Sequence, residues 1–377
     1  MKSLRFLAIL VVGSLVGTFV VLGQGPINKG AETVGRSKKK GDSNTPAEPE
    51  QQKIPSKFGK QKQEKQGEET PLFRTDATTV SVEVAVLDNN GHFIPKLPQG
   101  NFRILEDNVP QKVTGFSLGE GAMTIAMVIE FSGRFQQFYS ETWFQTLEAS
   151  YGFLQTLRPD DYCAIVAYDI KPEILSDFST DRRDAQEAMS RLKFAAFSEA
   201  NLFDALTFTA DRMQDIEGRK AILLISSGVD TFSKLTFDKA RKSLQNAGVP
   251  VFAVGLMQAI RDRYEAYGAI GAIQRMDFLQ ADNQMRTFAK ETGGMSFFPR
   301  FYSEFPSIFR EVQSAMRNQY VLTYQPTNQA KDGKFRKLKV ELVNPENNEP
   351  LKITVNGKQV KYSINAKPGY TAPREVE

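Results

Sequence analysis

The chain has 377 residues, of which 41% are hydrophobic and 24% are charged, and its formal net charge is +4. This is an ordinary globular composition, and the length allows roughly two domains of about 150 residues each. So small a net charge gives no basis for nucleic-acid binding, which leaves a strongly basic surface, and a single cysteine excludes an intramolecular disulfide bond.

The first 23 residues have the pattern of a secretory signal peptide. Lys2 and Arg5 precede a mostly apolar run over residues 6–22, and Val21 and Gly23 are suited to the positions before a cleavage point. The run is slightly shorter than the roughly 20 residues that a membrane span needs, which favours cleavage and export. The alternative is an uncleaved N-terminal anchor, which would be the chain's one contact with a membrane.

Residues 24–70 are predicted to be a disordered basic and polar tether. They contain ten Lys or Arg residues and seven Asp or Glu residues, and Phe58 is their one aromatic residue. A segment of this composition buries too little apolar surface to offset the entropy of ordering.

A β pattern begins near Pro71. Valine occupies every second position from Val80 to Val86, which predicts a strand with one buried face. After a turn at Asn90-Gly91, strands are expected over residues 102–105 and 111–116, with a turn at 107–110 between them. Residues 71–118 are therefore predicted to form an N-terminal β segment that is too small to be stable alone.

From Met123 the pattern changes to strands that alternate with helices. The expected strands are 124–129, 162–168, 221–225, 249–255 and 295–298, and the expected helices are 135–157, 181–192, 202–213, 237–246, 285–292 and 302–317. This alternation predicts an α/β domain over residues 119–318, with a mostly parallel sheet and helices on both faces. Residues 258–284 stand outside the pattern as an unusually long connection, either a lid or partner surface or a helical decoration that packs locally.

The C-terminal segment, residues 319–377, returns to a β pattern. Strands are expected over 320–324, 335–342 and 352–362, and Asn356-Gly357 predicts a tight hairpin within the last of these. Because the two β flanks are each too small alone, we expect them to pair into one small β-sandwich beside the α/β domain.

Polar loops follow the predicted buried strands, and ligands of an open parallel sheet bind outside the carboxyl ends of its strands. The polar residues that we single out in these loops are Glu130, Ser132, Arg134, Asn201, Ser227 and Asp230. The topology predicts that three loops bring them to one edge of the sheet.

A set of short motifs occurs in a fixed order along the chain: Phe102–Asn108, Leu157–Asp161, Asn201–Leu206, Gly218–Ala221, Asn246–Val251, Glu291–Gly294, Gln319–Tyr324, Asp332–Lys337 and Pro368–Tyr370. With this set, the layout resembles the von Willebrand factor type A domain, and in particular the bacterial VWFA-related family common in acidobacteria. The resemblance covers roughly residues 72–372. It implies a Rossmann-like fold and a module that binds another protein.

The resemblance also implies a metal-ion-dependent adhesion site, whose pattern is Asp-x-Ser-x-Ser, a Thr before a later helix and a final Asp, and which suits Mg²⁺. The matching residues are Glu130, Ser132, Arg134, Asn201 and Ser227, with Asp230 three residues beyond the last. The matching set thus has one carboxylate, that of Glu130, where the pattern has two. It also has the guanidinium of Arg134, which repels a cation by about 4 kcal/mol per pair of unit charges at about 4 Å and an effective dielectric constant of about 20.

We therefore expect a degenerate site without metal. Three alternatives remain open. Arg134 pairs with Glu130 and receives an acidic partner group, or it points to solvent in a site that has lost its function, or a variant site still binds Mg²⁺ in an adhesin.

Catalysis has little support in the sequence. Cys163 lies in an apolar run, which predicts a buried thiol, and His92, the one histidine, lies in a turn-like stretch. The chain therefore shows no pattern of a nucleophile with its base. The expected function is an exported, non-enzymatic protein-binding module without a cofactor, whose partner the sequence does not name.

Overall fold

The structure is a computed structural model that describes residues 79–374 except residues 90, 120, 194, 196, 217, 269, 270 and 356. The predicted signal peptide (1–23) and the predicted tether (24–70) lie outside the described residues. Within the described part of the chain, no helix has the length and apolar character needed to cross a membrane.

A six-stranded sheet is the centre of the α/β part, with strand order β10-β9-β8-β5-β6-β7. Its strands are β5 (Met123–Glu130), β6 (Tyr162–Tyr168), β7 (Pro172–Ser179), β8 (Arg219–Ser226), β9 (Val251–Gly255) and β10 (Ser296–Phe297). The pairs are parallel except for β6 with β7, which is antiparallel. Our sequence prediction missed β7 because its side chains are half-buried or exposed and form no continuous apolar run.

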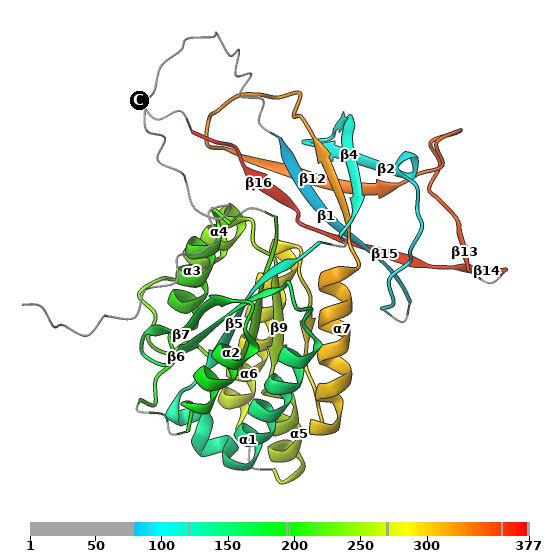
Figure 1. Ribbon diagram of the computed structural model, residues 1–377. Coiled ribbons are helices and arrows are strands. Elements are labelled where there is room, and N and C mark those ends of the chain that lie inside the picture. The colour runs from blue at the N-terminus through cyan, green and yellow to red at the C-terminus, as the bar shows by residue number, and fades with distance from the viewer. Residues whose placement is uncertain are drawn as a thin grey trace, which may run out of the picture. The chain divides into compact units, whose positions relative to one another are not determined.

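Helices cover both faces of this sheet (Figure 1). They are α1 (Gly133–Thr156), α2 (Arg182–Ser190), α3 (Leu202–Met213), α4 (Phe237–Ala247), α5 (Gln258–Ala266), α6 (Ala272–Thr292) and α7 (Phe305–Arg317), the last preceded by the 3-10 turn η3 (Tyr302–Glu304). In the central strand β5, Ile125 and Met127 pack in the core that includes α1, α2 and α7, and Ala126 and Val128 pack in the core that includes α3, α4 and α6. The predicted α/β architecture is confirmed.

Of the two interpretations of residues 258–284, the helical one agrees with the structure. These residues form α5 and the first half of α6, which continues without interruption to Thr292, so the helix expected at 285–292 is only the end of α6. The first half of α6 was not recognised with certainty because Met276 and Leu279 are 70% and 46% exposed. Apolar residues on the solvent side of a helix obscure the periodicity by which a buried face is recognised.

The two β flanks pair into a sandwich, as predicted. Its sheets have the orders β15-β1-β11-β4 and β16-β12-β2-β3. The strands are β1 (Val80–Asp88), β2 (Phe102–Glu106), β3 (Val109–Gln111), β4 (Val113–Leu118), β11 (Tyr320–Tyr324), β12 (Phe335–Leu342), β15 (Tyr362–Ala366) and β16 (Gly369–Thr371), with the short 3-10 helix η2 (Gln99–Asn101) before β2. The hairpin expected near Gly357 joins β13 (Ile353–Val355) to β14 (Lys358–Val360). Each main sheet mixes strands of both flanks around one core.

A buried polar cluster around Glu106 ties these strands together. The hydroxyl groups of Tyr324 and Tyr370 donate hydrogen bonds to Glu106 Oε2 at 2.6 and 2.9 Å. Burial, reinforced by the neighbouring carboxyl group of Glu106, raises the pKa of both tyrosines, so that the hydroxyls stay protonated as donors. The three residues belong to three separate motifs of the sequence, and the fold brings those motifs to one place.

The buried carboxylate of Asp161 joins the first strand of the α/β sheet to α7. It accepts hydrogen bonds from the backbone N–H groups of Met123 at 2.9 Å and Arg158 at 2.7 Å, and it forms an ion pair with Arg317. The side chains of Asp161 and Arg317 are 0% and 11% exposed, so each depends on the other for its charge to be balanced away from water.

We expect the substitution Asp161→Ala to lower the free energy of unfolding by about 3 kcal/mol, because it leaves the Arg317 guanidinium buried without its carboxylate. Denaturant unfolding of the native protein and the variant measures this loss. The exposed neighbour Asp160 provides the matched control, since Asp160→Ala should change stability by less than about 0.5 kcal/mol. Equal losses in the two variants would contradict the role assigned to Asp161.

Candidate functional site

The carboxyl ends of three neighbouring strands meet at one edge of the α/β sheet. Strand β5 lies between β6 and β8 and is parallel to both. Glu130, Tyr168 and Ser226 are the last residues of β5, β6 and β8. The strand order therefore places these three side chains and the loops that follow them beside one another.

Glu130 is the centre of a closed hydrogen-bond network at this edge. Its Oε1 accepts a bond from Ser132 Oγ at 2.9 Å. Its Oε2 accepts bonds from the backbone N and the Oγ of Ser227, both at 2.7 Å, and from Ser226 Oγ at 3.0 Å. The Tyr168 hydroxyl lies 2.7 Å from Ser226 Oγ. All five residues are at most 4% exposed, so the network is shielded from water.

Burial dominates the ionisation of this network. It raises the pKa of the Glu130 carboxyl above its ordinary value, and the hydrogen bonds donated by Ser227, Ser132 and Ser226 oppose the shift without cancelling it. Burial and the nearby Glu130 also raise the pKa of Tyr168. The fold therefore favours the neutral carboxylic acid more than water does.

Asn201 lies on the adjoining loop, which is fastened to the end of β6. Its backbone N–H donates to the carbonyl oxygen of Asp169 at 2.8 Å, and its Nδ2 donates to the carbonyl oxygen of Ile170 at 2.7 Å. Asn201 is 2% exposed, and its Oδ1 accepts no hydrogen bond from any described residue. A buried acceptor without a donor is costly, so this oxygen keeps a hydrogen-bonding capacity that no described residue fills.

Asp230 is engaged at helix α3 and has no contact with Glu130 among the described hydrogen bonds. Its Oδ1 accepts bonds from the backbone N–H of Phe203, at 3.2 Å, and from the hydroxyl of Ser233. A carboxylate at the first turn of a helix also interacts favourably with the helix dipole. Burial nevertheless raises the pKa of Asp230. The nearby carboxylate of Asp204 accepts hydrogen bonds from the backbone N–H groups of Lys234 and Leu235.

Arg134 is the second residue of α1, and its side chain lies outside the described part of the structure. The backbone beside it is fixed, because the N–H of Gly133 donates to the carbonyl oxygen of Phe197 at 2.6 Å. The start of α1 thus lies against the loop that leads to Asn201. That the guanidinium takes the place of a cation stays a prediction.

Cys163 is buried, as the sequence predicted, and His92 is exposed. Burial raises the pKa of the Cys163 thiol to about 12, which leaves almost no thiolate at neutral pH. The side chain of His92 is 77% exposed and lies 3.4 Å from Asp88 in the sandwich. Neither group is placed to act on a substrate at the Glu130 edge.

The matched residues are a poor set of ligands for Mg²⁺, which requires oxygen atoms in near-octahedral geometry. Both carboxyl oxygens of Glu130 already accept hydrogen bonds, and the hydroxyl hydrogens of Ser132 and Ser227 are directed at them. Within the described residues, no group of three or more Asp, Glu, His or Cys side chains is arranged to hold a metal ion. The oxygen atoms that these residues offer therefore do not fit a resident divalent cation.

Comparison with known proteins agrees with the architecture. Residues 125–229 match the family model of the von Willebrand factor type A domain. No curated protein matches the sequence. Among solved structures, proximal thread matrix protein 1 from the mussel byssus is 13% identical with a TM-score of 0.41, and the match covers 56% of this chain and 51% of that one.

Two bacterial structures are similar at the same level. The vWF domain of the type V pili tip protein Mfa5 from Porphyromonas gingivalis is 13% identical with a TM-score of 0.40, over 52% of this chain and 97% of that one. A von Willebrand factor type A structure from Catenulispora acidiphila is 10% identical with a TM-score of 0.39, over 80% and 75%. This chain spans about half the length of the mussel protein, and likenesses this weak carry no argument about function.

The raised pKa of Glu130 predicts a specific pH dependence for the variant Glu130→Gln. Above the ordinary value of 4.5 the unfolded chain loses its proton while the folded protein keeps it, so the native protein loses stability as pH rises from there toward the folded pKa. Glutamine keeps an acceptor for Ser227 and offers its amide to Ser132, but does not ionise. The stability of the variant relative to the native protein should therefore increase with pH across this window.

Denaturant unfolding over a pH series measures the difference. The exposed Glu173 on β7 supplies the control variant Glu173→Gln, which should stay within about 0.5 kcal/mol of the native protein throughout. A difference for Glu130→Gln that decreases as pH rises would show that the fold favours the ionised carboxylate instead.

Proposed function

Because the chain carries a von Willebrand factor type A domain, we propose that it is an exported protein-binding module, used in adhesion or assembly, that binds its partner without a metal ion and without catalysis. The support for export is the signal-peptide pattern of the first 23 residues. The support for binding comes from the surface around the Glu130 network.

Large apolar side chains are exposed around the carboxyl edge of the sheet, and this observation carries the proposal. Those on segments at that edge are Phe197, Phe232, Tyr267, Met276, Leu279 and Phe301. Exposed large apolar side chains on neighbouring segments support a contact surface for another protein. Aromatic and methionine side chains are also the types that protein interfaces favour.

Two of these rings stand on loops that are fastened to each other. Phe197 and Phe232 are 46% and 57% exposed. The backbone N–H groups of Thr231 and Phe232 donate to the carbonyl oxygen of Ala200, at 2.8 and 3.1 Å. The loops are thereby held in place before a partner arrives, which reduces the entropy lost on binding.

Catalysis is not supported by the same geometry. The Glu130 oxygens are occupied by internal donors, the Cys163 thiol is protonated, and His92 lies in the sandwich. A catalytic carboxyl, thiol or imidazole needs access to a substrate and a partner that moves its proton.

A Mg²⁺-dependent adhesin with a variant site is the second candidate, and the unpartnered Oδ1 of Asn201 is the observation in its favour. The two candidates differ in their response to the metal. A cation that binds the native state raises the melting temperature by mass action. We expect millimolar Mg²⁺ to change the melting temperature of the full chain by no more than about one degree, which corresponds to a negligible change in stability. A rise of several degrees would favour the adhesin.

The binding surface is tested with the double variant Phe197→Glu/Phe232→Glu. Charges at the centre of an apolar contact oppose its desolvation, so the variant should lose most of its capture of partners from a cell-envelope extract. The control is Phe335→Glu, which changes an exposed ring on β12 of the sandwich. We expect the native protein and the control to capture the same proteins, with or without a chelator.

The outcomes separate the parts of the proposal. No captured protein at all, or equal capture by the double variant, would contradict binding at the carboxyl edge. Capture that a chelator abolishes would leave the surface in place and overturn only its independence of metal.

A further inference from the structure

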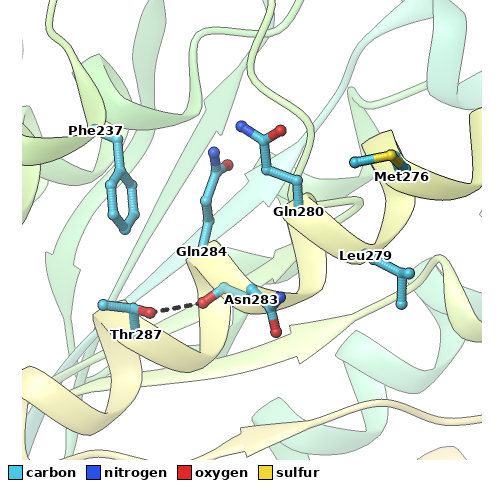
Figure 2. Close-up of a pocket in the computed structure, with 7 residues that line it drawn as sticks. All are labelled: Phe237, Met276, Leu279, Gln280, Asn283, Gln284 and Thr287. Atoms are coloured by element: carbon cyan, nitrogen blue, oxygen red, sulfur yellow. Dashed lines mark hydrogen bonds between the residues drawn. The ribbon is translucent and has the colours of Figure 1, made fainter. Parts of the chain in front are cut away.

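A groove runs along the first half of α6, facing the start of α4, at the same edge of the sheet (Figure 2). It has a volume of about 400 Å³ and is lined by Phe237, Met276, Leu279, Gln280, Asn283, Gln284 and Thr287. Part of this stretch of α6 belongs to the connection 258–284, for which the sequence left a helix as one of two interpretations. Its solvent side carries the two exposed aliphatic side chains Met276 and Leu279.

The groove has one rigid apolar wall. The ring of Phe237 packs against the rings of Phe203 and Phe288, with centroids 5.9 and 5.0 Å away. Phe203 and Phe288 are buried in the core between the sheet and α3, α4 and α6. Phe237 is therefore held in place as one apolar end of the groove. Met276 lies at the other end, with the side chains of Gln284 and Gln280 between them (Figure 2).

The polar lining consists of side-chain amides and a hydroxyl, without a charged group. Among the residues drawn in Figure 2, the one hydrogen bond runs from the Thr287 hydroxyl to the backbone oxygen of Asn283, at 2.8 Å. The amides of Gln280 and Gln284 thus offer donors and acceptors together. A lining of this kind suits an uncharged partner that itself presents paired N–H and C=O groups, and gives no balancing charge to an acidic or basic one.

The spacing of the amides matches an extended peptide. Gln280 and Gln284 are four residues apart on α6, which is about 6 Å along the helix axis. Figure 2 shows both side chains pointing to the same side of the helix. An extended chain presents the N–H and C=O groups of every second residue to the same side, at intervals of about 6.6 Å. Two successive outward-facing peptide groups of one strand therefore meet the two amides in register.

The groove is connected to the Glu130 network through Gly228. This residue follows Ser227 with a φ of +78°, and a Cβ placed on it would lie 2.9 Å from the carbonyl oxygen of Ala281 on α6. Only glycine accommodates both the left-handed backbone and so close a helix. Helix α6 therefore packs directly on the loop that holds Ser227, and one partner can cover both features.

We propose that this groove binds an extended, uncharged segment of the partner protein. Its main chain lies along α6 with hydrogen bonds to Gln280 and Gln284, and one apolar side chain packs against the ring of Phe237. The assignment rests on the proposed protein-binding function and adds the chemistry of the partner and the place where it docks.

A display library of random short peptides, selected on the immobilised full chain, tests this directly. We expect the enriched peptides to be uncharged with one large apolar residue. Their affinity should fall about thirtyfold in the variant Gln280→Ala/Gln284→Ala, since it removes two hydrogen bonds that are each worth about 1 kcal/mol. Met276→Glu should also weaken binding, because it places a charge in the lining of a groove that has no balancing charge.

Matched controls separate the groove from the rest of the surface. Gln214→Ala removes an exposed amide after α3, and Phe144→Glu adds a charge at an exposed ring on α1; neither should change the affinity. Enrichment of acidic or basic peptides, or affinities that the groove variants do not change, would overturn the proposal. Self-association of the chain that Met276→Glu abolishes would overturn it in favour of a second copy as occupant.

The two proposals fail in different ways. Peptides that lose affinity in Phe197→Glu/Phe232→Glu but not in the groove variants would overturn the groove alone and leave protein binding at the carboxyl edge intact. No enriched peptide, together with no captured protein from the envelope extract, would overturn both.

Discussion

The carboxyl group of Glu130 is buried at the end of the central strand, and its hydrogen bonds decide what the carboxyl edge of the sheet can do. A buried carboxyl group must be neutralised or provided with donors. Here the hydroxyls of Ser132, Ser226 and Ser227 and one backbone N–H provide them. The carboxyl group at the position that matches a metal ligand thus has its hydrogen bonds within the chain. The edge is internally bonded, and we propose that it presents apolar side chains and amides to a partner.

The network depends in turn on the order of the strands. Because β5 lies between β6 and β8, the loops after all three strands converge, and hydrogen bonds between loops hold them there. The contact between Gly228 and α6 extends this arrangement to the groove on that helix. The β-sandwich also depends on how strands from distant parts of the chain are arranged. Its two flanks are each too short to be stable alone, and their strands alternate in the sheets around one core that contains the buried Glu106 cluster.

Much of the fold and of the arrangement at the carboxyl edge was predictable, because both follow from the periodicity of apolar residues and from the order of the elements along the chain. The apolar run of β5 and the apolar face of helix α3 follow from local pattern, and their direction places Glu130, Ser132 and Ser227 at one edge. Strand β7 and the full length of helix α6 were not predicted, since a half-buried edge strand and a helix with exposed methionine and leucine lack a clear apolar period. The capping role of Asp230 was also beyond the sequence, because its partner Phe203 lies 27 residues away. A turn-forming Ser three residues after Asp230 was the one local signal.

The central claim is that the Glu130 network takes the place of a metal ion at this edge. The most direct measurement is anomalous diffraction from crystals of the full chain grown with Mn²⁺, an ion that prefers the same oxygen ligands as Mg²⁺. The account predicts no anomalous density among Glu130, Ser132, Asn201 and Ser227, with the serine hydroxyls still bonded to the carboxyl group. An ordered Mn²⁺ ion coordinated by Glu130 and Ser227 would contradict it.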